Sequence, residues 1–291
     1  MSASPDFATA VRPSVGGGAG GEPLLSVRGL RVAVADGTEV VHGVNLDVPR
    51  GSAAGLVGES GSGKTLTCRA VLGLLPAGVQ VTGGEIAFDG TELTALPGAE
   101  RARLRGTGIA AVFQDPASYL NPSITVGRQL AEVLRVKVGL GRRAARERAV
   151  ELLHAMGLRR PEHVCTQYPF ELSGGMLQRV LIAMAISADP ELLIADEATT
   201  ALDVTVQAEV LELLSELRRD RGLTLVVVSH DLAVIAQTCD TVHVFRDGAV
   251  VESGPTRRVL RAPRHPYTRQ LVDAHERFGI DRVREPRRRS R

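Results

Sequence analysis

The chain has 291 residues, of which 44% are hydrophobic and 23% are charged, so it can bury an ordinary core without disulfides or structural metals. Its 35 basic and 33 acidic residues leave a formal charge of +2, which excludes a whole-protein field directed at nucleic acid or a membrane surface. The three cysteines form no CxxC pair, so we expect neither a disulfide framework nor a zinc ribbon; they are Cys68, Cys165 and Cys239. This cysteine usage also predicts that the protein works in a reducing compartment.

The two ends of the chain differ in composition from its centre. Residues 1–23 are rich in Gly, Ala, Ser and Pro without a hydrophobic period, which predicts a disordered leader. Residues 281–291 form an arginine-rich tail, which we expect to be a solvated, disordered segment. No run approaches the roughly 18 apolar residues of a membrane-spanning helix, so we expect neither a span nor a signal peptide.

Four short apolar runs between these ends are typical of buried parallel strands. They are "AAGLVGES", "GIAAVFQD", "LLIADEA" and "TLVVVSHD", and each ends in small or polar residues. Such runs predict an α/β fold, in which ligands bind beyond the carboxyl ends of the strands. We therefore expect residues 58–65, Gln114, Asp196 with Glu197, and His230 to converge on one crevice.

The pattern changes to a helical period from about residue 116 to residue 188. Apolar residues recur there at intervals of three and four, as in "RRAARERAVELLHAMGL", and arginine fills most of the other positions. This stretch predicts a helical subdomain inserted into the sheet domain.

The sequence "GLVGESGSGKT" contains the pattern G-x-x-x-x-G-K-T between a predicted strand and a predicted helix. In that context backbone N–H groups cradle phosphate, Lys64 neutralises the β and γ oxygens, and the Thr65 hydroxyl reaches Mg²⁺. Lys64 and Lys137 are the only lysines in a chain that otherwise uses arginine. The predicted phosphate-binding residues are Gly58, Glu59, Ser60, Gly61, Ser62, Gly63, Lys64 and Thr65.

Three further strand ends carry residues suited to phosphoryl transfer. Asp196 is predicted to hold Mg²⁺, and Glu197 to polarise the attacking water. His230 could contact the γ-phosphate or hold the water. Gln114 could contribute an amide to Mg²⁺ or to the water, and it stands where the sheet meets the helical insert.

A second half of a phosphate site is present in "LSGGMLQ". The Ser173 hydroxyl, the backbone of Gly174 and Gly175 and a positive helix end can bind an anion, but this turn lacks a lysine and a metal ligand. We therefore expect a head-to-tail dimer in which each turn completes the site held by the other subunit's Lys64 loop.

Taken together, these motifs resemble those of the ATP-binding cassette (ABC) ATPases. "GESGSGKT" is similar to the Walker A loop, Gln114 to the Q-loop glutamine, "LSGGMLQ" with Gln178 to the signature, "LLIADE" to Walker B, "ALD" ending at Asp203 to the D-loop, and His230 to the switch histidine. The resemblance covers about residues 24–275. It implies a P-loop NTPase with a RecA-like parallel sheet, an N-terminal antiparallel β subdomain and the inserted helical subdomain.

The resemblance also implies cofactors and partners. ATP with Mg²⁺ would close the dimer, and hydrolysis would open it and drive two transmembrane permease subunits at the cytoplasmic face of the inner membrane. The second ATPase could be the same or a homologous chain, and an extracytoplasmic solute-binding protein would act indirectly. A cassette domain over residues 24–254 would be followed by a C-terminal extension over residues 255–280.

Within that family, "TTALDVTVQAEVL" and "APRHPYTRQLVDAH" resemble the peptide and nickel importer ATPases, and other stretches are most similar to the nickel-import subunit. Peptide and nickel stay open as cargo. One departure concerns adenine, because no Phe, Tyr or Trp occurs between Leu24 and Val57, which leaves Val34 or Ala35 for apolar contact. A soluble ABC protein acting on nucleic acid or ribosomes is the alternative, supported by the arginine-rich tail alone.

Overall fold

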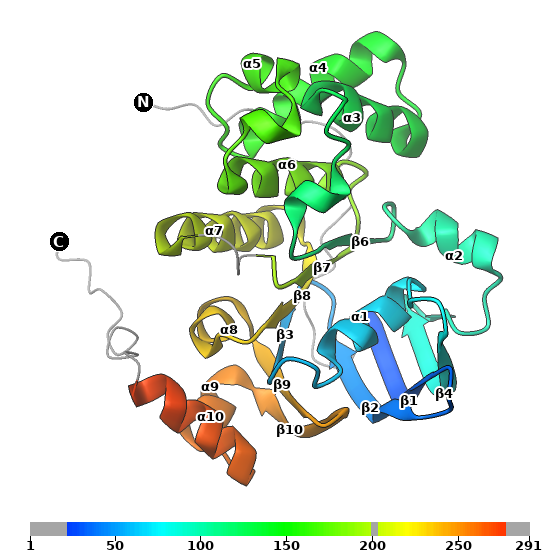
Figure 1. Cartoon of the computed structure of the whole chain (residues 1–291), viewed down its shortest axis with the longest axis vertical. Helices are drawn as coiled ribbons and strands as arrows, with labels where there is room; N and C mark the ends of the chain where they lie inside the picture. Colours follow the sequence, from blue (N-terminus) through cyan, green and yellow to red (C-terminus); the bar gives the residue numbers. More distant parts are fainter. Residues whose placement is uncertain (1–21, 199–202, 278–291) are drawn as a thin grey trace.

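The computed structural model describes residues 22–198 and 203–277. The predicted basic tail, nearly all of the predicted leader and two residues of the "ALD" motif therefore lie outside the described residues. Within the described part, the chain forms two sheets and a layer of helices (Figure 1).

A six-stranded sheet carries the predicted strand ends. Its order is β10-β9-β3-β8-β7-β6, and every neighbouring pair is parallel except β10 with β9. The strands are β3 (Ala53–Val57), β6 (Ile109–Val112), β7 (Leu192–Asp196), β8 (Thr224–Ser229), β9 (Thr241–Arg246) and β10 (Ala249–Pro255). All residues of β3, β7 and β8 are buried, as expected for central strands covered on both faces. The four strands that the sequence predicts are confirmed.

The pairing of β9 with β10 was not part of the prediction. Asp247 and Gly248 join the two strands, and both have positive φ, 46° and 77°. Asp-Gly at such a turn is a strong local hairpin signal, so this element could have been found from the sequence. The hairpin forms one edge of the sheet beside the strand that leads into the Lys64 loop.

An antiparallel sheet adjoins this core, which confirms the N-terminal β subdomain. Its order is β2-β1-β4-β5, formed by β1 (Leu25–Val34), β2 (Glu39–Val48), β4 (Val79–Phe88) and β5 (Thr91–Glu92). Apolar side chains of this sheet, of helix α1 (Lys64–Leu72) and of one face of the large sheet form a common buried cluster. The cluster fixes α1, and with it the loop that precedes α1.

Helices cover the other face of the large sheet (Figure 1). Between residues 116 and 186 the chain forms η1 (Pro116–Tyr119), α3 (Val126–Val133), η2 (Leu134–Val138), α4 (Arg142–Ala155), α5 (Pro161–Thr166), η3 (Pro169–Glu171) and α6 (Gly174–Ile186). The remaining helices are α2 (Gly98–Leu104), α7 (Val204–Arg221), α8 (Leu232–Thr238), α9 (Thr256–Arg261) and α10 (Pro266–Arg277). A helical layer thus occupies the stretch where the sequence predicts one.

Candidate functional site

The loop between β3 and α1 is enclosed at its base. Gly58 has φ 153°, and a Cβ there would stand 2.2 Å from the Phe245 carbonyl oxygen. The Asp-Gly turn of the β9–β10 hairpin also contacts the loop, because the Gly248 N–H donates to the Ser62 carbonyl at 3.2 Å. The tip is open, since Glu59, Ser60 and Gly61 are exposed. The base of the loop is thus held by contacts with β9 and the β9–β10 turn, whereas its exposed tip can contact a ligand.

Lys64 lies inside this loop and is 4% exposed. Its ammonium donates to the carbonyl oxygens of Gly58 and Glu59, each at 2.8 Å, and to Ser62 Oγ at 3.2 Å. Burial lowers the pKa of Lys64, and the nearby charges of Glu197 and Asp196 oppose that shift. A buried ammonium aimed at loop oxygens fits a role in binding phosphate oxygens of a nucleotide.

Thr65 and Asp196 bring the ends of two elements together. The Thr65 hydroxyl donates to Asp196 Oδ1 at 3.1 Å, and Asp196 is 5% exposed. Burial raises the pKa of Asp196, and the hydrogen bond from Thr65 partly offsets this. A hydroxyl beside a buried carboxylate is a fitting donor pair for Mg²⁺, which keeps several water and phosphate ligands. No group of three His, Cys, Asp or Glu residues in the described ranges could hold a metal ion by itself.

Glu197 and His230 follow β7 and β8, which are neighbouring strands. Glu197 has φ 49°, a strained value for a residue with a side chain, and its N–H donates to the Val228 carbonyl at 3.0 Å. His230 Nδ1 lies 3.8 Å from Glu197 Oε1. The His230 side chain is 55% exposed and that of Glu197 21%, so both can reach a ligand.

Gln114 follows β6, which is one strand further from the Lys64 loop than β7. Its side chain is exposed, at the point where the sheet passes into the helical layer. Its predicted contact with Mg²⁺ or water stays a prediction.

The Ser-Gly-Gly turn caps α6 in the helical layer, apart from α1 (Figure 1). Ser173 Oγ accepts from the Met176 N–H at 3.4 Å, and Ser173 and Gly174 are exposed. A Cβ on Gly175 would stand 2.4 Å from Val206 Cγ1 of α7, so glycine allows this turn to approach α7. The turn is therefore preformed and exposed at the start of α6.

Two residues predicted to bind nucleotide have other surroundings. Gln178 is 1% exposed within α6, and its predicted contact with nucleotide stays a prediction. Asp203 caps α7, because its Oδ1 accepts from the Val206 N–H at 2.9 Å, and it is exposed. Its contact with nucleotide stays a prediction.

Sequence reasoning assigned no role to Tyr267, although "HPYT" was among the stretches that supported the resemblance. The Tyr267 hydroxyl accepts from the Glu59 N–H at 3.1 Å, so α10 contacts the phosphate loop. Because 208 positions separate the two residues, no spacing rule could have placed them together.

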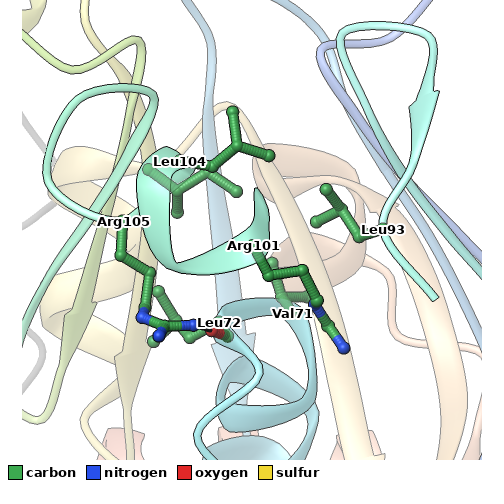
Figure 2. A pocket seen from close by; sticks show the side chains of 7 residues that line it. Val71, Leu72, Leu93, Arg101, Leu104 and Arg105 are labelled. Carbon is green, nitrogen blue, oxygen red and sulfur yellow. Dashed lines mark hydrogen bonds between the residues drawn. The ribbon is translucent and has the colours of Figure 1, made fainter. Parts of the chain in front are cut away.

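A small cavity under α2 is unrelated to this site (Figure 2). It measures about 10 Å³ and lies between α2 and the end of α1. Arg101 donates to the Ala70 carbonyl at 2.7 Å and Arg105 to the Leu72 carbonyl at 3.2 Å. These hydrogen bonds join α2 to the carbonyl groups at the C-terminal end of α1, where the Gly73 N–H also donates to the Ala70 carbonyl.

The three cysteines are free thiols. Burial raises the pKa of Cys68 well above its ordinary value, that of Cys165 to about 11 and that of Cys239 to about 12. None of them is therefore suited to act as a nucleophile at neutral pH.

Comparison with known proteins decides the family. The model of the ABC transporter family matches residues 41–200, which include the Lys64 loop, the signature turn and the acidic pair. The chain belongs to this family. The relatives of this ABC ATPase include the dipeptide transport ATP-binding protein DppD of Escherichia coli, 42% identical over 264 residues, which cover 90% of this chain and 81% of that protein.

Two other relatives are of similar identity. The oligopeptide transport ATP-binding protein OppD of Bacillus subtilis is 45% identical over 253 residues, covering 86% of this chain and 71% of that protein. The peptidoglycan transport ATP-binding protein YejF of Agrobacterium fabrum is 44% identical over 257 residues, which cover 87% of this chain but only 47% of that protein.

Solved structures agree with the fold. A dimeric ATP-binding cassette in a post-hydrolysis state, bound to ADP and Pi, superposes with a TM-score of 0.71 and 28% identity, over 80% of this chain and 99% of that one. CbiO1 of Clostridium perfringens gives a TM-score of 0.73 and 28% identity, over 89% and 98%. The ABC ATPase fold is confirmed, and the chain is an ATP-binding subunit that hydrolyses ATP.

Among the helices of residues 22–198 and 203–277, none combines the length and the apolar character that a membrane span requires.

Proposed function

We propose that this ABC ATPase powers the import of short peptides through transmembrane partner subunits. The observation that supports this cargo is its similarity, over 86–90% of its length, to transport ATP-binding proteins whose names specify dipeptides or oligopeptides. Nickel, suggested by sequence resemblance, is the competing cargo. No contact among the described residues favours a soluble protein acting on nucleic acid or ribosomes.

The loop of residues 58–65 would hold the triphosphate. Its backbone N–H groups and the Lys64 ammonium would bind the β and γ oxygens, and Thr65 with Asp196 would hold Mg²⁺. The bound metal ion would neutralise charge on the β- and γ-phosphates. Lys64 already lies inside the loop, so little reorganisation is needed to place its charge near the transferred group.

Glu197 would act as the general base. It would accept a proton from water as the water oxygen bonds to the γ-phosphorus, while the bond to the ADP oxygen breaks and Lys64 stabilises the leaving charge. His230 lies 3.8 Å from the Glu197 carboxylate and would hold the γ-phosphate or the water in line. Gln114, at the border of the helical layer, would report the state of the site to the permease-facing helices.

The site would be completed in a head-to-tail dimer. Ser173 and the N–H groups of the signature turn are exposed and preformed in one chain, and they would close on ATP held by the partner. The dimer would act on two permease subunits from the cytoplasmic face of the membrane. An extracytoplasmic solute-binding protein would deliver the cargo to those permease subunits. Whether the partner is a second copy or a homologous ATPase does not alter this geometry.

Uptake measurements test the proposal. A labelled dipeptide and ⁶³Ni²⁺ are supplied side by side to cells with the gene, cells without it, and cells carrying Lys64→Ala or Lys137→Ala. Lys137 is the matched control, because it is the other lysine of the chain and its ammonium bonds the Arg105 carbonyl, away from the loop. We expect dipeptide uptake to be lost without the gene and with Lys64→Ala, and kept with Lys137→Ala. Loss of nickel uptake alone would contradict the peptide assignment, and persistence of both would contradict an importer of either cargo.

A further inference from the structure

Helix α10, in the C-terminal extension, is anchored against the sheet at its first turn. The Glu252 carboxylate of β10 accepts from the N–H groups of Arg264 and His265, each at 3.0 Å. Tyr267 is 4% exposed, and the Arg246 guanidinium, at the end of β9, lies 4.9 Å from the centre of its ring. These contacts fix the Tyr267 side chain between the end of β9 and the phosphate loop.

The Tyr267 hydroxyl contacts Glu59, the loop residue whose carbonyl group also binds Lys64. It accepts from the Glu59 N–H at 3.1 Å, while the Glu59 carbonyl accepts from the Lys64 ammonium at 2.8 Å. One residue of the loop is therefore bonded on its N–H side to α10 and on its carbonyl side to Lys64. A shift of α10 would move the backbone on which the lysine rests.

The third turn of α10 makes a second contact, with the loop that carries His230. His275 Nε2 lies 2.7 Å from Oδ1 of Asp231, the residue that follows His230. The same Asp231 oxygen accepts from the Ala233 N–H at 2.7 Å, which caps α8. The backbone beside His230 is thereby tied to α10 on one side and to α8 on the other.

Both contacts come from one short helix and reach two neighbouring strands. Tyr267 and His275 are eight positions apart, about 12 Å along a helix, and the loops they contact follow β3 and β8, which pair directly. We propose that α10 is a positioning element that sets the phosphate loop and the His230 loop relative to each other, with Tyr267 and His275 as positioning residues. This inference rests on the roles proposed above for Lys64 and His230.

Tyr267→Phe tests the first contact in the full chain, because it removes the hydroxyl and keeps the ring. We expect a non-hydrolysable ATP analogue with Mg²⁺ to bind about fivefold more weakly, since a net hydrogen bond is worth about 1 kcal/mol. The control is Tyr168→Phe, the same change at an exposed tyrosine of the helical layer. Its analogue affinity should equal that of the wild type.

His275→Ala tests the second contact. We expect kcat for ATP hydrolysis to fall about fivefold with analogue affinity unchanged, because the binding loop keeps its own contacts while His230 loses its support. His275→Gln, whose amide nitrogen can replace Nε2 as a donor to Asp231, should recover at least half of the lost rate. Asp273→Ala, an exposed change on the same helix, is the control and should keep full activity.

If Tyr267→Phe or His275→Ala lowers the melting temperature, amide hydrogen exchange replaces affinity and kcat as the measurement for that variant. Tyr267→Phe should speed exchange in the peptide containing Glu59 while β8 keeps its protection. The inference is overturned if Lys64→Ala loses analogue binding but Tyr267→Phe and His275→Ala match their controls in affinity, kcat and exchange. If Lys64→Ala itself binds and hydrolyses like the wild type, the proposed function of the loop fails instead.

Discussion

The two glycine-containing turns of this ATPase, residues 58–63 before α1 and residues 173–175 at the start of α6, both lie at helix N-termini, but they are built differently. The first is enclosed by the β9–β10 hairpin and is followed directly by the buried Lys64. The second is exposed, is capped by its own serine and has no lysine. The contrast supports the proposal that one turn holds a phosphate within its own chain and the other is presented to a neighbouring chain.

Glu197→Gln should have the largest effect on the enclosed site. The general base is lost while the phosphate loop is untouched, so we expect ATP hydrolysis to fall at least about 100-fold with ATP affinity kept. Turnover and analogue binding are measured on the same preparation. Glu212→Gln, an exposed change on α7, is the control. Near-normal turnover of Glu197→Gln would refute the assignment of the base.

Ser173→Arg should separate the two turns. We expect hydrolysis by the dimer to be lost, because the arginine blocks the presented turn, whereas a monomer should bind ATP like the wild type. Ser173→Thr keeps a capping hydroxyl and should stay active. Weaker ATP binding by the Ser173→Arg monomer would place this turn in its own chain's site and remove the contrast.

Gly58→Ala and Gly175→Ala compare the two turns by their packing. A Cβ at Gly58 meets a backbone oxygen at 2.2 Å, so we expect a loss of about 3 kcal/mol in the free energy of unfolding. A Cβ at Gly175 meets the Val206 side chain at 2.4 Å, and we expect a loss of about 1–2 kcal/mol. Urea unfolding measures both.

Val206→Ala distinguishes the side-chain clash expected at Gly175 from the backbone clash expected at Gly58. Combined with Gly175→Ala, it should cost less than the sum of the two single changes, because it removes the clashing methyl groups. Combined with Gly58→Ala, it should give simple additivity. Additivity in both cases would show that the glycine at the signature turn is not required by α7.

His243 of β9 gives a smaller, pH-dependent effect on the sheet that supports the enclosed loop. Burial lowers its pKa to about 4, against 6.5 ordinarily, and it pairs with Leu56 of β3. The unfolded chain therefore binds a proton that the folded chain does not, so stability is full above pH 6.5 and falls by up to about 3 kcal/mol as pH drops toward 4.

His243→Leu should flatten this part of the pH profile. The free energy of unfolding is measured between pH 4 and 7 for the wild type and the variant. An unchanged slope would assign the acid sensitivity to other groups.

The sequence predicted the parts of the site that depend on one rule, namely that parallel strands end at one edge. Lys64 and Asp196 meet there because β3 and β7 flank β8, and Glu197 meets His230 because β7 pairs with β8. The helical layer followed from periodicity. Their chemical roles stay predictions until the variants are measured.

Other features depended on tertiary packing that no local pattern encodes. Gln178 belongs to a signature motif by sequence, but the packing of α6 buries it. Tyr267 meets Glu59 because the chain returns to the sheet after more than 200 residues. The Asp-Gly hairpin is different, because its turn signal is present in the local sequence.

The protonated state of the three thiols has a practical consequence. Because burial holds the pKa values of Cys165 and Cys239 at about 11 and 12, and that of Cys68 higher than normal, maleimide reagents should leave the native chain unlabelled near neutral pH. A cysteine introduced at an exposed position outside both turns, such as 212, would then be the reactive thiol. A spectroscopic probe attached there could follow the approach of two cassettes without first removing the native cysteines.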